Sequence, residues 1–376
     1  MYKQLIMLAL VGVWLWVSPP LSATRPTEAR TCAYPSHVTA LTSGPHHTIL
    51  VGTEEGRVYR GQDSASGCLS PLPTAPAHSP IGVLVMLPGR PDQIIAGGNL
   101  LISPAPALYR SEDGGKTWAD GAPGLGNTGV RPIQIATSRR GTLVLAYRCP
   151  DQRAAPAGVA VRTCADGLAR SADGGRTWRI IGPRGVPLHG VVALTDGAFL
   201  TVADAPRGAR ASLCVHRSDD DGRTWRLVGR LPVSANTNDL ATLFVAPGRT
   251  SLVLAGFGIA LFNPSVYRST DGGTQWTRTW RRAGNLTGGD VAVVAFAGLA
   301  CCHRLLLSTW EAIYRSDDEG RTWVRVILPK VPGPLRIWTL LATTGGTTAY
   351  AGTTRGLYRS DDGGLTWTAL SPTSKQ

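Results

Sequence analysis

A short pattern recurs six times along this chain and limits what the chain can fold into. It places serine, aspartate, glycine, threonine and tryptophan at fixed positions, S-x-D-x-G-x-T-W, with Gln275 replacing threonine in one copy. The copies are YRSEDGGKTW at 109–118, ARSADGGRTW at 169–178, HRSDDDGRTW at 216–225, YRSTDGGTQW at 267–276, YRSDDEGRTW at 314–323 and YRSDDGGLTW at 358–367. Six copies are typical of structural joints in a repeat protein, not of six active sites.

The spacing of the copies defines the repeat. Their serines stand 60, 47, 51, 47 and 44 residues apart. The stretch VYRGQDSASGC at 58–68 is a decayed seventh copy, in which Gly61 takes the serine place, Asp63 keeps the acid and Cys68 takes the tryptophan place. Seven units of about 50 residues therefore account for the chain from residue 37 onward.

Each unit contains four short strand patterns. In the last unit they are IWTLLATT, TTAYAGTT, GLYRS and TWTAL, separated by glycine, aspartate and proline turn signals. The 45 glycines and 27 prolines also favour a turn-rich, all-β chain. Four strands per unit is the content of a propeller blade. We predict an all-β, seven-bladed β-propeller over 37–371, with four-stranded antiparallel blades and the pattern on each third-to-fourth strand hairpin.

The residue types of the pattern suit such a hairpin. Serine and aspartate hydrogen-bond turn amides, glycine accepts positive φ, and tryptophan returns the chain to the core. A sugar or metal site at each copy is the alternative. The structural positions are Asp113, Trp118, Asp173, Trp178, Asp220, Trp225, Asp271, Trp276, Asp318, Trp323, Asp362 and Trp367.

The pattern is identified as the Asp box, or bacterial neuraminidase (BNR) repeat, and the resemblance covers residues 37–370. Asp-box propellers include sialidases, oligoxyloglucan-type glycosidases, sortilin-like receptors and the photosystem II assembly and stability factors. The resemblance implies the fold but does not choose among these functions. A single seven-bladed unit with an export signal is most similar to the photosystem II assembly-factor type.

The N-terminus reads as an export signal. Lys3 precedes an apolar run from Leu5 to Val17, which ends before a pair of prolines and a small-residue stretch. The run is short of the roughly 20 residues that span a bilayer, so we predict a signal peptide at 1–23, with an uncleaved anchor as the alternative. A segment at 24–36 and a tail at 372–376 flank the propeller, and the mature chain is expected to be secreted or periplasmic, without a membrane span.

Seven cysteines in an exported chain favour disulfides. Cys149 and Cys164 bracket a long loop, and a disulfide that closes it would stabilise the fold by about 3 kcal/mol. A second disulfide, between Cys32 and Cys68, could tie the N-terminal segment to the first repeat. The partners of Cys214, Cys301 and Cys302 cannot be read from the sequence. The CCH at 301–303 lacks a second ligand pair, so no metal or cofactor is expected.

The net charge of +13 comes almost entirely from arginine. The arginines are spread along the chain instead of forming basic runs, so no specific nucleic-acid binding is expected, only weak, salt-sensitive association. An arginine recurs directly before the serine position of each box. These arginines are expected to support their own hairpins or a neighbouring blade; the alternative is that they form an anion-binding ring. The positions are Arg60, Arg110, Arg170, Arg217, Arg268, Arg315 and Arg359.

Loops of variable length point to one face of the ring as the binding face. In a propeller the second-to-third and fourth-to-first connections share a face, opposite the boxes and the first-to-second turns. Binding is usually built on loops that vary over a repeating framework. The variable second-to-third loops lie at 54–56, 97–107, 148–167, 204–212, 256–265 and 310–312.

A ring of polar residues begins the innermost strands and is predicted to converge at the mouth of the central channel on that face. These residues are His37, Arg131, His189, Asp239, Asp290 and Arg336, with Glu55, Trp310, Glu311 and Arg355 above them. We take the ten as the predicted ligand site. The alternative is that polar residues at strand starts are merely solvated.

Two classes of function fit these residues. A sialidase is disfavoured because the F/Y-R-I-P motif is missing, although Asp239 and Asp290 could act as the two carboxylates of a glycosidase. We favour a monomeric, non-catalytic propeller that binds a protein or peptide partner through its loop-rich face, with a glycan as the second ligand class. Hydrolysis of extracellular glycans is the alternative function.

Overall fold

The computed structural model describes residues 32–64, 68–73, 80–98, 108–125, 130–149, 165–205, 213–232, 240–249, 251–259, 262–281, 292–329, 331, 333–343 and 346–370. The chain divides into two units, Met1–Thr31 and Cys32–Gln376, and all described residues belong to the second. The predicted signal peptide and C-terminal tail lie outside the described residues. In the described part no helix is long and apolar enough to cross a membrane.

The first four sheets each consist of four consecutive strands, which we call blades 1 to 4. Blade 1 contains β1 (Val38–Ser43), β2 (Thr48–Thr53), β3 (Val58–Gln62) and β4 (Leu69–Pro71). Blade 2 contains β5 (Ile81–Leu87), β6 (Arg90–Gly98), β7 (Leu108–Ser111) and β8 (Ala119–Asp120). Blade 3 contains β9 (Arg131–Thr137), β10 (Leu143–Arg148), β11 (Gly167–Ser171) and β12 (Arg179–Arg184). Blade 4 contains β13 (Leu188–Ala193), β14 (Phe199–Asp204), β15 (Leu213–Ser218) and β16 (Arg226–Leu231).

The remaining three sheets repeat this arrangement as blades 5 to 7. Blade 5 contains β17 (Leu240–Val245), β18 (Val253–Ile259), β19 (Phe262–Ser269) and β20 (Thr277–Arg281). Blade 6 contains β21 (Val293–Leu299), β22 (Arg304–Thr309), β23 (Ile313–Ser316) and β24 (Val324–Val326). Blade 7 contains β25 (Ile337–Ala342), β26 (Ala349–Thr353), β27 (Gly356–Ser360) and β28 (Thr368–Leu370).

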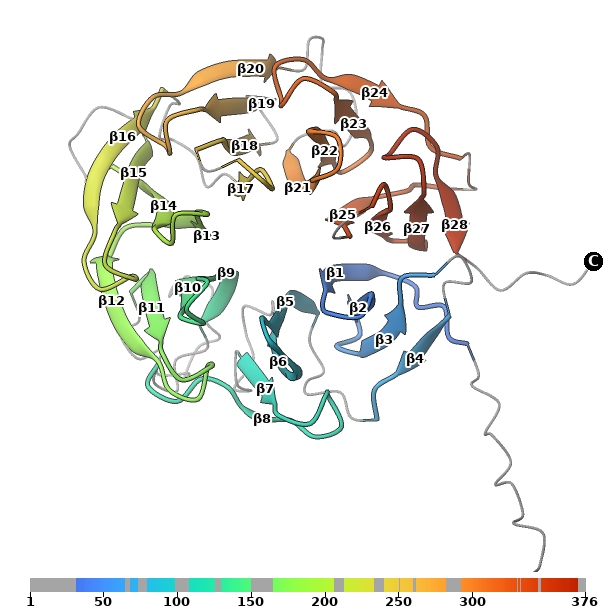
Figure 1. Cartoon of the computed structure of the whole chain (residues 1–376), viewed down its shortest axis with the longest axis horizontal. Helices are drawn as coiled ribbons and strands as arrows, with labels where there is room; N and C mark the ends of the chain where they lie inside the picture. The colour runs from blue at the N-terminus through green and yellow to red at the C-terminus, as the bar shows by residue number, and fades with distance from the viewer. Residues whose placement is uncertain are drawn as a thin grey trace, which may run out of the picture. The chain divides into compact units, whose positions relative to one another are not determined.

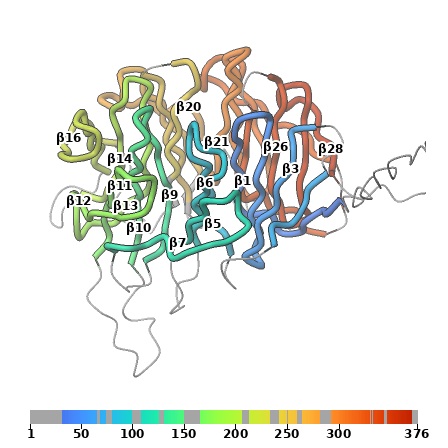
Figure 2. Tube along the Cα trace, turned by 60° about the horizontal axis from the view of Figure 1, so that its bottom comes forward, coloured from blue at the N-terminus to red at the C-terminus, as the bar shows by residue number. Residues whose placement is uncertain are grey.

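The blades form a closed ring. Each innermost strand contacts the innermost strand of the next blade, and β25 contacts β1, which joins the last blade to the first. Figure 1 shows the first strand of every blade nearest the centre and the fourth at the rim, and Figure 2 shows the blades standing side by side. All neighbouring strands within a blade are antiparallel, so the predicted seven-bladed, four-stranded propeller is confirmed.

The apolar core lies between the blades. The described residues form seven buried clusters, and each cluster joins two neighbouring blades. Leu50 of blade 1, for example, packs with Ile81 and Ile94 of blade 2. Because a four-stranded blade has two apolar faces, it can bury both only between two neighbours, which is why the sequence needs a complete ring.

Each Asp box closes the hairpin between a third and a fourth strand, as predicted. In blade 2 the Ser111 hydroxyl donates to Asp113 Oδ1 at 2.8 Å and accepts from the Gly115 amide at 2.7 Å. The amides of Lys116 and Thr117 donate to Asp113 Oδ1 at 3.0 and 2.9 Å. Gly115 has φ +90°, which a residue with a Cβ rarely adopts. The hydrogen bond from the glycine amide to the serine hydroxyl recurs in the other five boxes.

The box tryptophans pack between blades, as the residue pattern predicts. Trp178 and Trp367 are buried, and the other four are partly buried. Each belongs to, or packs against, the apolar cluster shared with the preceding blade; Trp178 of blade 3, for instance, lies in the cluster with Leu108 of blade 2. The box is therefore a structural joint that fixes a turn and anchors one blade to the previous one.

The box carboxylates predict a loss of stability in acid. Burial acts to raise the pKa of Asp173, Asp220 and Asp362, but hydrogen bonds from the box threonine, serine and amides outweigh it and lower each pKa from 3.8 to about 2. A carboxyl whose pKa is lower in the folded than in the unfolded protein stabilises the fold. This stabilisation is complete at a pH above the pKa of the unfolded state and is lost as the pH falls through the pKa of the folded state. We expect the urea midpoint of unfolding to drop as the pH is lowered from about 4 to about 2. The urea midpoint of Asp220→Asn should fall less steeply with decreasing pH than that of the wild type. Equal slopes would show that the box carboxylate does not contribute to the acid sensitivity.

The recurring arginines bridge or brace the blades, one of the roles expected from the sequence. Arg110 Nε donates to the Gly174 carbonyl of the next box at 2.8 Å, and Arg170 Nε donates to the Asp221 carbonyl at 2.7 Å. Arg268 contacts the carbonyl of Glu319 in the same way at 2.8 Å. Arg217 instead pairs with Asp219 of its own hairpin. These contacts assign Arg110, Arg170, Arg217 and Arg268 to the framework.

The first and last blades meet without sharing a strand. Asp63, the acid of the decayed box, accepts a hydrogen bond from Tyr350 Oη at 2.8 Å and lies 3.1 Å from Arg359 Nη1 in blade 7. This carboxylate thus bonds across the seam where the chain closes its ring. Cys32 and Cys68 form the predicted disulfide. Next to it Ala33 pairs with Leu69 of β4 through a single bridge.

Only one cysteine of the second predicted disulfide lies within the described residues. Cys149 is disulfide-bonded, while its predicted partner Cys164 lies outside the described residues. Cys214, Cys301 and Cys302 are free.

Candidate functional site

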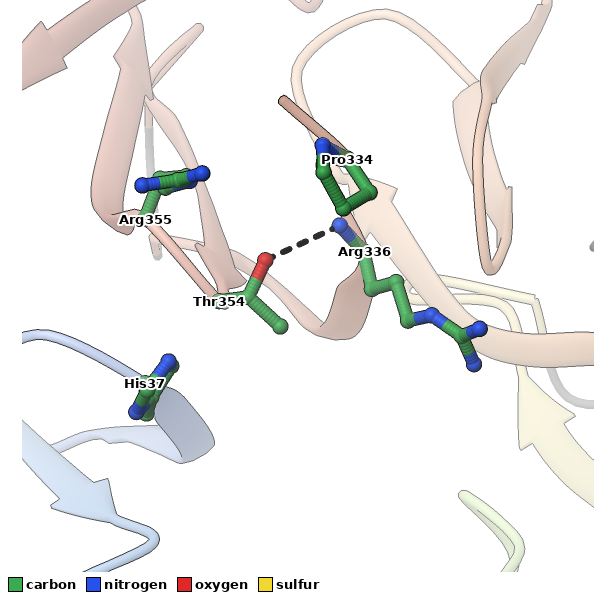
Figure 3. A pocket seen from close by; sticks show the side chains of 5 residues that line it. All are labelled: His37, Pro334, Arg336, Thr354 and Arg355. Atoms are coloured by element: carbon green, nitrogen blue, oxygen red, sulfur yellow. Dashed lines mark hydrogen bonds between the residues drawn. The ribbon is translucent and has the colours of Figure 1, made fainter. Parts of the chain in front are cut away.

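A pocket of about 310 Å³ opens where blade 7 meets blade 1, on the face that carries the second-to-third turns. Figure 3 shows the five residues that line it: His37, Pro334, Arg336, Thr354 and Arg355. His37 and Arg336 directly precede the innermost strands β1 and β25, and Thr354 and Arg355 form the β26–β27 turn. Three of the ten predicted ligand residues, His37, Arg336 and Arg355, therefore line one pocket.

Hydrogen bonds from backbone amides hold the walls of this pocket, which we call the seam pocket. The Arg336 amide donates to Thr354 Oγ1 at 3.1 Å, and the Thr354 amide donates to the Arg336 carbonyl at 2.9 Å. Across the pocket, the Glu54 amide donates to the His37 carbonyl at 3.0 Å. A Cβ added at Gly333 would meet Arg355 Nη2 at 2.6 Å, so the missing side chain leaves room for that guanidinium.

The seam pocket is basic, and its acidic neighbours stand at one edge. His37, Arg336 and Arg355 are exposed, and no carboxylate is among the five lining residues. Glu54 and Glu55 approach His37 Nδ1 with their carboxylate oxygens at 3.5 and 3.6 Å. Two guanidinium groups in an open pocket favour an anionic ligand group, because a guanidinium matches the geometry of a carboxylate or phosphate.

Two tryptophans extend the seam pocket toward blade 6. The guanidinium of Arg336 lies 5.3 Å from the centre of the Trp310 ring, within the range of a cation–π contact. The rings of Trp310 and Trp338 are 6.4 Å apart, and the Trp310 carbonyl accepts from the Ile337 amide at 2.8 Å. The buried Trp338 Nε1 has no hydrogen-bond partner among the described residues. We call Trp310, Arg336 and Trp338 the aromatic shelf.

A second polar cluster lies where blade 3 meets blade 4, and it contains two further predicted residues, Arg131 and His189. Arg148 Nη2 is 3.2 Å from His189 Nδ1, and His189 Nε2 is 2.7 Å from Asp204 Oδ1. Because a guanidinium only donates, Nδ1 accepts and Nε2–H donates to the carboxylate. Burial, followed by the positive charge of Arg148, lowers the pKa of Arg131.

Asp166 completes this blade 3–4 cluster. Its Oδ1 accepts from the Cys149 amide at 2.7 Å. Burial raises the pKa of this carboxyl, and the amide bond and Arg148 only partly offset the effect. Asp204 also raises it, since a second negative charge nearby disfavours ionisation. The cluster thus contains a carboxyl that holds its proton more tightly than usual beside a carboxylate bonded to histidine.

The remaining predicted residues fall into two groups. Glu55 stands beside His37, and Glu311 follows Trp310 in the β22–β23 turn. Asp239 and Asp290, the predicted pair of glycosidase carboxylates, lie outside the described residues. Across the described ranges no group of three or more histidine, cysteine or acidic side chains has the arrangement of a metal site.

Sequence reasoning missed Trp338, Arg148, Asp166 and Asp204. Trp338 is the second residue of its inner strand, whereas the predicted site uses the polar residue at the start of each strand. The other three stand at the ends of second-to-third loops, at 148–167 and 204–212. The lengths of those loops were the available signal, but loop length alone does not show which flanking side chains meet.

Comparisons with known proteins agree with this architecture. A family model for the BNR/Asp-box repeat matches residues 358–369. No curated protein matches the sequence. Among solved structures, YCF48 bound to D1 peptide is 11% identical with a TM-score of 0.55, over 92% of this chain and 96% of that one. An ancestral GH74 enzyme is 15% identical with a TM-score of 0.60, over 92% of this chain.

The extracellular domain of a one-component system from B. thetaiotaomicron is also similar, at 14% identity and a TM-score of 0.57 over 88% of this chain. The chain spans 39% of that domain and 48% of the GH74 enzyme. At these identities the likeness shows the fold alone. The chain folds as a β-propeller of seven four-stranded blades, and the BNR/Asp-box repeat model matches the box of its last blade.

Proposed function

We propose that this propeller is an exported, non-catalytic binding protein that holds a protein or peptide partner on its loop-rich face. The observation that carries the proposal is the seam pocket, an open basic pocket that adjoins an aromatic shelf. Such a surface fits a peptide that offers a carboxylate beside an apolar or aromatic side chain. A glycan without acidic groups would leave both arginines without an anionic partner.

Two further observations support a peptide ligand. The box carboxylates bond within their own hairpins, and Arg110, Arg170 and Arg268 each bond to the box of the next blade. The loop-rich face is therefore presented on a ring whose blades are tied together, which loses little entropy on binding. The similar structure of YCF48, which has nearly the same length as this chain, is that of a complex with a peptide. The predicted signal peptide supports export, as does the likeness to an extracellular domain.

The proposal predicts that the two pocket arginines contribute a measurable share of the binding energy. Hydrogen bonds to charged groups contribute roughly 1.5–3 kcal/mol each. We therefore expect Arg336→Ala with Arg355→Ala to weaken peptide binding by at least about a hundredfold. The measurement is binding of labelled protein to a peptide library of varied charge, with a glycan array run in parallel.

A matched control separates the pocket from overall charge. Arg223→Ala with Arg321→Ala removes two exposed arginines from the box hairpins of the opposite face and changes the net charge equally. This control should bind the same carboxylate-bearing peptides as the wild type does. Equal weakening in both double variants, or selection of neutral glycans alone, would contradict the proposal.

Hydrolysis of extracellular glycans is the second candidate function, and one observation favours it. The blade 3–4 cluster holds Asp166, with a raised pKa, beside Asp204, and glycosidases pair a protonated carboxyl with an ionised one. A panel of glycosides and oligoxyloglucans tests this function directly. The binding proposal expects no turnover above that of Asp166→Asn, whereas turnover that disappears in Asp166→Asn and Asp204→Asn would establish hydrolysis in its place.

A further inference from the structure

Two adjacent free cysteines occupy the turn between β21 and β22, on the face opposite the proposed binding face. Cys301 is exposed and Cys302 is partly exposed. The Cys302 amide donates to the Leu299 carbonyl at 3.4 Å, and His303 has φ +53°. The turn is therefore tight, and it presents both thiols near the surface, where a small reagent can reach them.

The two sulfur atoms face each other. Their separation is 2.7 Å, against the 2.03–2.05 Å of a disulfide bond. The other free thiol of the described residues differs, because Cys214 is buried and accepts from Arg230 Nη1 at 3.4 Å. Cys32, Cys68 and Cys149 are already in disulfides. Within the described part of the chain, only Cys301 and Cys302 bring two free thiols together.

We propose that Cys301 and Cys302 form a reversible thiol–disulfide pair that exchanges with small-molecule disulfides such as oxidised glutathione. One thiolate attacks the reagent, forming a mixed disulfide and releasing one glutathione as thiolate. The second cysteine then attacks the protein sulfur of that mixed disulfide and releases the second glutathione. The protein loses two protons and two electrons, and the reagent gains them as two thiols.

The adjacency of the two residues makes the oxidised form easy to reduce. Adjacent Cα atoms are about 3.8 Å apart across a trans peptide. Disulfides usually join Cα atoms roughly 4.4–6.8 Å apart, and departures from that range store strain and favour reduction. The Cys32–Cys68 disulfide has a Cα–Cα distance of 4.8 Å, inside that range. The turn pair should therefore be reduced under conditions that leave Cys32–Cys68 oxidised.

The test uses the purified full chain in glutathione buffers of graded redox potential. The reaction is run at mildly alkaline pH, because the hydrogen bond to Cys302 raises the pKa of the Cys301 thiol. Free thiols are then alkylated and peptides are mapped by mass spectrometry. We expect the 301–302 peptide to lose two hydrogens at oxidising potentials and to regain them at reducing ones, while Cys32–Cys68 stays intact.

Single substitutions distinguish the pair from ordinary surface thiols. Cys302→Ser should stop at the mixed disulfide and retain glutathione on Cys301, whereas Cys214→Ser should cycle like the wild type. Three results in the wild-type protein would overturn the proposal: alkylation of both thiols at every potential, a stable glutathione adduct at either one, or disulfide-linked dimers. Because these are read on the wild type, a variant that fails to fold does not affect the test.

Discussion

Replacing Asp63 with alanine is expected to lower the free energy of unfolding by about 3 kcal/mol, because it removes the buried carboxylate that pairs with the guanidinium of Arg359. The side chains of Asp63 and Arg359 are 8% and 9% exposed. Tyr350, which donates to Asp63, is also buried, and its pKa is raised by burial and by that bond. This network is a polar contact between the first and last blades.

The same arginine supplies an internal control. Asp361 also pairs with Arg359, at 2.6 Å, but its side chain is 60% exposed. Exposed ion pairs contribute about 0–1 kcal/mol, so Asp361→Ala should cost much less than Asp63→Ala. Denaturant unfolding of both variants, followed by tryptophan fluorescence, measures the difference. Equal and small losses would show that the Asp63 contact does not hold the ring closed.

Removing the disulfide between Cys32 and Cys68 is the second large effect expected. The bond closes a sequence separation of 36 residues. Chain-entropy reasoning assigns such a loop about 4 kcal/mol of stabilisation. We expect the double variant Cys32→Ser, Cys68→Ser to lose about that amount in denaturant unfolding at neutral pH. The disulfide stands where a tryptophan occupies the other units, so it replaces an apolar anchor with a covalent one.

Paired substitution is a cleaner test than added reductant, because reductant would also reach the disulfide of Cys149. Cys301→Ser is the matched control, since it removes an exposed free thiol and should change stability by less than about 0.5 kcal/mol. If the double variant proved as stable as this control, the N-terminal segment would contribute nothing to closing blade 1.

Much of the fold could be predicted because its determinants are local. The box residues bond within one hairpin, as Ser111, Asp113 and Gly115 do, so the residue order alone specifies the joint. The strand patterns of the last unit correspond to β25–β28 in the structure. The blade count follows from the repeat count, including the decayed copy at 58–68.

The contacts across the ring could not be predicted in the same way. Asp63 and Tyr350 are 287 residues apart, and no local pattern pairs an acid of a decayed box with a tyrosine of the last blade. Of the six polar residues at the starts of innermost strands, His37 and Arg336 line the seam pocket. The choice of strand-start residues does not select Asp166 and Asp204, because they stand where second-to-third loops join strands of two neighbouring blades, and loop length does not show which flanking side chains come near one another.

Site-specific photo-crosslinking is the most direct test of partner binding at the seam pocket. A photoreactive residue at position 55, beside His37, reports on the loop-rich face, and one at Arg321 reports on the box face. In envelope extracts we expect a discrete crosslinked partner from position 55 that is lost with Arg336→Ala and Arg355→Ala, and none from position 321. A partner captured equally from both positions, or from position 321 alone, would contradict binding at the seam pocket.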